Sequence, residues 1–131
     1  LGDGAVQLLG FDVDGLYKMP GDQIVVTLYW KALTPLSRNY QTFVHLYDDG
    51  RLLAQHDGAP DCNMNPTTQW EPGQIIADSH ILTVPLDSPA GTPLLLAGMY
   101  DLITGERLAV PHTPDNLVNL TKVEITTSEQ E

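Results

Sequence analysis

Side chains of the types that perform catalysis are few in this sequence, and they do not fall into a known motif. The chain has four histidines and one cysteine. A hydrolase needs a nucleophile, a base and a group that orients the base, and no serine stands in a Gly-x-Ser-x-Gly elbow. His45, His56, His80 and His112 fall on different expected strands or loops, and no partner can be named for Cys62. We therefore expect no catalytic residue and no enzymatic activity, and we interpret the histidines as polar or half-buried strand residues.

Metal-ligating side chains are also present without a metal-binding pattern. A zinc site needs three or four ligands, and the histidines are not paired at the spacing of such a site. Residues 61–65 read Asp-Cys-Asn-Met-Asn, which matches the opening of a calcium-binding loop. However, Pro66 replaces the glycine that this loop requires, and Pro72 replaces its bidentate glutamate. We expect no metal site and no cofactor, with a structural calcium ion as the alternative that the sequence leaves open.

The charge balance argues against one class of partner. Seventeen acidic residues against six basic ones give a formal net charge of −11 over 131 residues. Nucleic acids and anionic membrane surfaces need lysine and arginine to replace their counterions, so we expect neither as a partner. The sequence has no apolar run of about 18 residues, so we expect no membrane insertion by this segment. Its first residues do not resemble a signal peptide, and we expect the chain to be part of a larger protein.

Proline and glycine divide the chain into short segments that favour strands over helices. The ten prolines and eleven glycines fall in turn-like pairs such as Asp14-Gly15, Pro20-Gly21 and Pro72-Gly73. Between these turns, no segment keeps a convincing helical apolar period. The expected strands cover residues 6–13, 23–33, 40–48, 51–56, 74–84, 93–101, 107–110 and 117–126.

This strand pattern predicts a single all-β domain over residues 1–131, with an ordered core over about 5–126. Short strands separated by frequent turns are typical of an antiparallel sandwich of two sheets. We predict an immunoglobulin-like sandwich of about seven to nine strands, with a jelly roll as the alternative.

Alternation along the strands separates core side chains from outward ones, because successive side chains in a strand point to opposite faces. In the strands expected over 23–33, 40–48 and 93–101, we assign the more apolar of the two faces to the core. Its residues are Ile24, Val26, Leu28, Trp30, Ala32, Thr42, Val44, Leu46, Leu95, Ala97 and Met99.

The outward faces of the same strands carry many aromatic side chains. If the three strands belong to one sheet, these side chains form one surface. Such rings could stack on the C–H faces of sugars, with Gln41, His45 and Lys31 beside them to bind hydroxyl groups. We add Trp70, which lies in the expected loop 57–72, as a further candidate. The candidate glycan-binding residues are Tyr29, Phe43, His45, Tyr47, Trp70 and Tyr100.

The long segment Asp57–Pro72 offers a competing interpretation of the same aromatic side chains. Segments of this length are usually functional or cover something. We favour the interpretation that this loop folds over the aromatic face and that Trp70 docks on it. The aromatic side chains would then form a small satellite core under the loop. Whether the face is open or covered decides between the two.

Several short sequence segments, taken in their order along the chain, resemble those of a known family. They are PGD at 20–22, LYWKAL at 28–33, FVHLYDDG at 43–50, LAQHDG at 53–58, WEPG at 70–73, DSH at 78–80, GMYD at 98–101 and TGERL at 104–108. Over residues 5–126 the chain resembles the β-sandwich domain at the C-terminus of some bacterial membrane glycosyltransferases of the dolichyl-phosphate-mannose type. One departure is visible, since Thr92 and Pro93 stand where that family tends to an aromatic and then a basic residue.

The resemblance implies a non-catalytic accessory domain on the extracytoplasmic side, tethered through a membrane segment outside this chain. The catalytic carboxylates would lie elsewhere in the parent enzyme, and no catalytic residue is carried over to this domain. The implied partners are a glycan, an acceptor protein or the rest of the parent enzyme. The alternative function is a carbohydrate-binding module of a secreted glycan-active protein.

Overall fold

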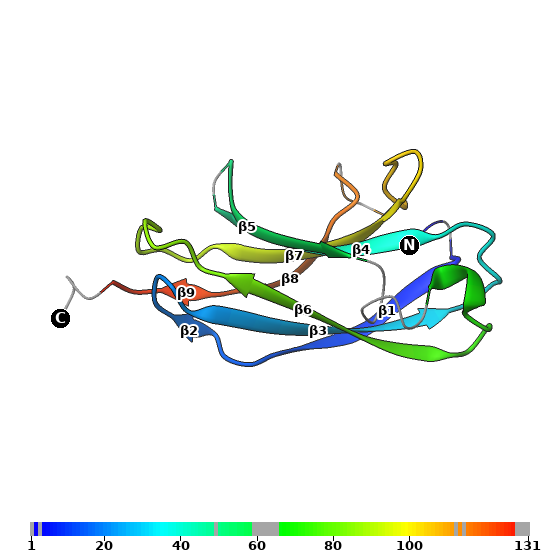
Figure 1. Ribbon diagram of the computed structural model, residues 1–131, viewed down its shortest axis with the longest axis horizontal. Coiled ribbons are helices and arrows are strands. Elements are labelled where there is room, and N and C mark those ends of the chain that lie inside the picture. The colour runs from blue at the N-terminus through cyan, green and yellow to red at the C-terminus, as the bar shows by residue number, and fades with distance from the viewer. Residues whose placement is uncertain are drawn as a thin grey trace.

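A computed structural model describes residues 2, 4–48, 50–58, 66–111, 113 and 115–127. Two antiparallel sheets face each other in it (Figure 1). The first has the order β1 (Val6–Val13), β3 (Gln23–Ala32), β6 (Ile75–Thr83). The second has the order β5 (Arg51–Gly58), β4 (Tyr40–Asp48), β7 (Leu94–Asp101), β8 (Val118–Lys122). His112, Cys62 and the calcium-like segment 61–65 lie outside the described residues.

The strand order confirms the predicted fold class. Sheet order β1-β3-β6 corresponds to strands A-B-E of an immunoglobulin-like sandwich, and β5-β4-β7-β8 corresponds to C′-C-F-G. Two short strands, β2 (Tyr17–Lys18) and β9 (Glu124–Ile125), form a parallel pair. This pair links the segment between β1 and β3 to the end of the chain's last strands. Sequence patterns did not reveal β2, because two paired residues carry no periodicity. The 3-10 turn η2 spans Thr67–Gln69.

Some expected strands differ from the prediction by more than one residue. The strand expected over 51–56 continues to Gly58, so Asp57 lies in β5 and not in the loop expected over 57–72. The strand expected over 107–110 is reduced to one bridge between Arg107 and Tyr100, because the amide of Val110 bonds the side chain of Asn116 instead of a strand. The strand expected over 117–126 breaks between β8 and β9. At that break the amide of Val123 donates to the carbonyl of Pro93, and proline has no N–H to continue the ladder.

The alternation predicted for the core is confirmed. Along β3, every second residue from Ile24 to Ala32 is buried. On the facing sheet, the inward side chains of β4 and β7 are buried as well, among them Val44, Leu46 and Leu95. Burial of these apolar side chains stabilises the sandwich by roughly 1.5–3 kcal/mol for each large side chain.

The assumption that β3 shares a sheet with β4 and β7 is wrong. β3 pairs with β1 and β6, whereas β4 pairs with β5 and β7. The outward face of β3 therefore lies on the opposite side of the molecule from the outward face of β4. This separates Tyr29 from the other aromatic candidates.

Candidate ligand-binding face

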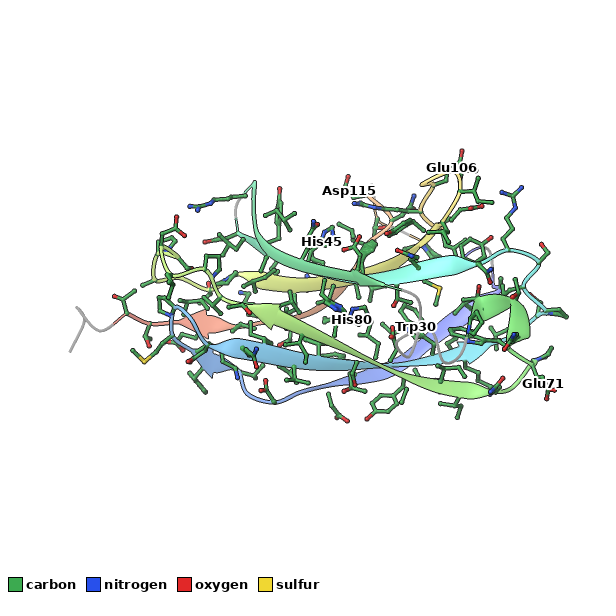
Figure 2. All side chains as sticks on the ribbon, viewed as in Figure 1. Trp30, His45, Glu71, His80, Glu106 and Asp115 are labelled. Atoms are coloured by element: carbon green, nitrogen blue, oxygen red, sulfur yellow. The ribbon has the colours of Figure 1, made fainter. Side chains whose placement is uncertain are left out.

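Four of the six candidate residues share one surface, the outer face of the sheet β5-β4-β7-β8. Phe43, His45 and Tyr47 alternate along β4 with the buried Thr42, Val44 and Leu46, and Tyr100 follows on the neighbouring β7. The ring of Phe43 lies 4.7 Å from that of His45 and 5.9 Å from that of Tyr100, measured between centroids. We call this surface the aromatic face, and in Figure 2 His45 points outward from it.

Tyr29 lies on the other sheet, so it is not part of the aromatic face. Its hydroxyl donates a 2.6 Å hydrogen bond to Oδ2 of Asp12 on β1. That bond to a carboxylate raises the pKa of Tyr29. The candidate surface therefore loses this member, because the alternation of a strand determines its inner and outer sides but not the sheet in which it pairs.

Trp70 lies in the core and not on the aromatic face. Only 4% of its surface is exposed, and it joins the main hydrophobic cluster between the sheets. Thr67 helps to direct the chain there, because its hydroxyl donates to the carbonyl of Arg38 at 2.7 Å and accepts from the amide of Tyr40 at 2.9 Å. The interpretation that Trp70 docks on the aromatic face is therefore wrong, and residues 59–65 of that loop lie outside the described part of the chain.

Two adjoining hollows make a groove across the aromatic face. The first encloses about 250 Å³ and is lined by Phe43, His45, Gln55, Asp57, Tyr100 and Arg107. The second encloses about 330 Å³ and adds Tyr47, Leu52, Leu96, Asp115 and Leu117. His45 and Arg107 line both hollows. We call the two together the outer groove.

Strand register explains which side chains meet in the outer groove. Phe43 stands opposite Asp57 on β5 and opposite Gly98 on β7, and His45 stands opposite Gln55. Residues opposite each other in a sheet project to the same face. Asp57 and Gln55 were not singled out from the sequence, because alternation along β5 gives their face but not the register that places them beside Phe43 and His45.

Arg107 is another groove residue that sequence patterns did not single out. Its guanidinium carbon lies 5.1 Å from the centroid of the Phe43 ring, and its Nη1 donates to the carbonyl of Asp115 at 3.0 Å. Below the ring, a Cβ on Gly98 would come within 2.6 Å of Cζ of Phe43. Phe43 is thus only 1% exposed, so it supports the guanidinium more than it offers a stacking surface. A cation held over a ring in this way is attracted by the ring quadrupole.

Two titratable side chains of the groove, Tyr100 and His45, favour their uncharged forms. The Tyr100 hydroxyl donates to Oε1 of Gln41 at 2.7 Å, and burial, together with the charge of Asp57, raises the pKa of Tyr100. Burial lowers the pKa of His45 below its ordinary value of 6.5, with the charge of Asp57 opposing that shift and Arg107 adding to it. At neutral pH the groove therefore presents a phenol and a neutral imidazole, each able to donate and accept a hydrogen bond.

A separate polar cluster lies in the core between the sheets. Oδ2 of Asp78 accepts hydrogen bonds from Nε1 of Trp30 at 3.2 Å and from the hydroxyl of Thr42 at 2.5 Å, and it lies 2.9 Å from Nε2 of His80. Nδ1 of His80 lies 2.7 Å from Nδ1 of His56 on β5. Figure 2 places His80 and Trp30 between the two layers. We call these residues the core polar cluster.

The core polar cluster differs from a catalytic triad in two ways. Asp78 and Thr42 both contact the same nitrogen of His80, whereas a triad aspartate holds the opposite ring nitrogen from the nucleophile. Thr42 is completely buried, and Asp78 and His80 are each 1% exposed. A hydroxyl in that position cannot reach a substrate, so the cluster satisfies buried polar groups of the core.

The described residues contain no group of three or more histidine, cysteine, aspartate or glutamate side chains placed to hold a metal ion. The same residues also form no helix that is long and apolar enough to cross a membrane.

No family model and no curated protein matches this chain. Similar solved structures exist at low identity. The C-terminal domain of Wzt matches with a TM-score of 0.63 and 13% identity, covering 98% of this chain and 77% of that one. A Niemann-Pick type C2 protein from the Japanese carpenter ant matches with a TM-score of 0.55 and 7% identity, over 95% and 93% of the two chains. The CARDB domain of a Pyrococcus furiosus protein, in complex with di-metal ions, matches with a TM-score of 0.51 and 12% identity, over 94% of each chain. At such identities these likenesses establish the shared fold alone.

Proposed function

We propose that this domain is a non-catalytic glycan-binding domain that serves a larger glycan-active protein. The observation that carries the proposal is the outer groove, where Tyr100, Tyr47 and His45 stand beside the polar ends of Gln55, Asp57 and Arg107. Sugars present apolar C–H faces and hydroxyl groups together, so a site for them needs rigid aromatic area and hydrogen-bonding groups side by side.

The arrangement suits binding better than turnover. The groove side chains come from β4, β5 and β7 and the segment after β7, and these three strands are hydrogen-bonded neighbours in one sheet. A preformed site of this kind loses little conformational entropy when a ligand binds. Among the described histidines, His56 and His80 belong to the core polar cluster. The groove residues named above place no serine, threonine or cysteine beside His45.

The test is binding of the purified domain to a glycan array, followed by titration calorimetry with the ligands found. Replacing Tyr100 by alanine is expected to weaken binding at least about tenfold, since aromatic anchors carry much of such affinity. Tyr29→Ala is the matched control, because Tyr29 is a tyrosine on the opposite face. An array without binders, or equal loss in both variants, would contradict the proposal.

The identity of the larger protein is a separate part of the proposal. The resemblance to the C-terminal domain of membrane glycosyltransferases supports an accessory domain that is tethered on the extracytoplasmic side and contacts the glycan, an acceptor or the parent enzyme. A secreted glycan-active protein with this domain as its carbohydrate-binding module is the alternative. The full coding sequence separates them, because many apolar helices upstream support the first and a secretion signal with a hydrolase domain supports the second.

A further inference from the structure

Two opposite charges face the first hollow of the outer groove without neutralising each other. Asp57 on β5 and Arg107 after β7 both line it and are both exposed. The ion pairs within the described part of the chain involve other carboxylates, those of Asp14, Asp78, Asp87 and Asp101. The hydrogen-bonding capacity of Asp57 and Arg107 is therefore not used up by a bond between them.

Together these side chains offer an acceptor and a donor to one ligand. An ionised carboxylate only accepts hydrogen bonds, and a guanidinium only donates them. Two neighbouring hydroxyl groups of a sugar match this pair, since one can donate to Asp57 while the oxygen of the other accepts from Arg107. The guanidinium is held in place beforehand by the Phe43 ring and the Asp115 carbonyl, so binding does not have to order it.

The charge around the groove favours an uncharged ligand. A sugar acid would approach Asp57 and Asp115, and it would also meet the field of a chain with a formal net charge of −11. An amino sugar would be attracted by these carboxylates but would lie against Arg107. A neutral sugar meets neither repulsion.

The second hollow differs from the first in being mainly apolar. Leu52, Leu96 and Leu117 line it with Tyr47. It adjoins the first hollow through His45 and Arg107, so a ligand that fills one reaches the other directly. An apolar hollow suits the C–H face of a sugar ring better than its hydroxyl edge.

From this juxtaposition we infer that the outer groove binds two consecutive units of an uncharged glycan. The neighbouring hydroxyl groups of one unit bind Asp57 and Arg107, and the next unit packs on Leu52, Leu96 and Leu117. This inference rests on the proposed glycan-binding function and specifies its ligand class and its two subsites.

The experiment measures binding of four probes by titration calorimetry. The probes are a neutral hexose disaccharide chosen from the array, its monosaccharide, a uronic acid disaccharide and an amino sugar disaccharide. The neutral disaccharide is expected to bind at least about tenfold more tightly than each of the others. Tighter binding of the acidic or basic disaccharide, or equal binding of monosaccharide and disaccharide, would overturn the inference and leave the proposed function standing.

Substitutions assign the two subsites. Asp57→Asn and Arg107→Gln are each expected to weaken the neutral disaccharide about tenfold, because each removes a charge-assisted hydrogen bond. Leu117→Ala is expected to weaken the disaccharide and leave the monosaccharide unchanged. Arg51→Gln is the matched control, since Arg51 is an exposed arginine that pairs with Asp87 and does not line the groove. Full affinity in Asp57→Asn and Arg107→Gln, with circular dichroism showing folded protein, would overturn the inference, whereas binding of no glycan by any variant or by the original chain would overturn the proposed function itself.

Discussion

Gly98 on β7 lies against the Phe43 ring, where a larger residue would clash with the ring. A Cβ there would lie 2.6, 2.9 and 3.0 Å from three ring carbons of Phe43, which is closer than van der Waals contact allows. The ring in turn supports Arg107. The absence of a side chain at Gly98 therefore leaves room for the Phe43 ring that supports the main cation of the outer groove.

Replacing Gly98 by alanine is expected to move the Phe43 ring and the guanidinium above it. We expect a loss of about 1–3 kcal/mol in the free energy of unfolding, as for other overpacked positions, and weaker glycan binding. Urea denaturation and calorimetry measure the two effects. Gly10→Ala is the control, because Gly10 is a strand glycine on β1 with open space around its Cβ position. Equal stability of the two variants would show that Phe43 can move away without cost.

β5 connects the two polar features of the molecule. Its outward residues Gln55 and Asp57 line the outer groove, and its inward residue His56 contacts His80 of the core polar cluster. A single strand thus carries side chains of the outer groove on one face and a buried histidine contact on the other.

The free energy of unfolding is expected to fall as pH drops through about 6.5. Burial and then the nearby His80 lower the pKa of His56 below its ordinary value of 6.5, while Asp78 and Asp57 act in the opposite direction. The unfolded chain then binds more protons than the folded one just below that pH, so acid favours unfolding. Burial lowers the pKa of His45 too, which adds to this effect with the same sign.

Urea denaturation between about pH 8 and pH 5 measures this dependence. The variant His56→Asn keeps a hydrogen-bond donor near His80 but cannot titrate in this range. We expect its stability to vary less with pH than that of the original chain. An unchanged pH profile in the variant would mean that His56 has the same pKa in the folded and unfolded protein.

The molecule as a whole is one sandwich with chemically different outer faces. The aromatic face carries the outer groove, while the face of the opposite sheet carries Tyr29 bonded to Asp12. Between the sheets, the apolar cluster includes Trp30 and Trp70 together with side chains from both layers. With one continuous cluster, the sheets have no separate cores that could unfold independently.

We therefore expect the chain to unfold in one cooperative transition. Trp30 and Trp70 are both buried, so their fluorescence reports on the core, whereas far-ultraviolet circular dichroism reports on the strands. The two signals should change at the same urea concentration, as in other two-state domains of this size. Separate midpoints would instead indicate two units within the chain.

Much of the fold could be predicted because side-chain alternation is a local property of extended backbone. The period of two along 23–33, 40–48 and 93–101 was sufficient to identify the side chains that face the core. It was also sufficient to place Phe43, His45 and Tyr47 outward. Each of these conclusions needs only the covalent geometry of one strand.

The pairing of strands and the path of loops depended on contacts between residues far apart in the chain. Alternation could not show that β3 pairs with β6 instead of β4, which removed Tyr29 from the groove, nor that the Thr67 hydrogen bonds turn Trp70 into the core. It also could not bring Asp57 and Arg107 to one hollow. These outcomes are set by which surfaces bury most apolar area and satisfy most hydrogen bonds in the complete fold, so they exist only once the two sheets have packed.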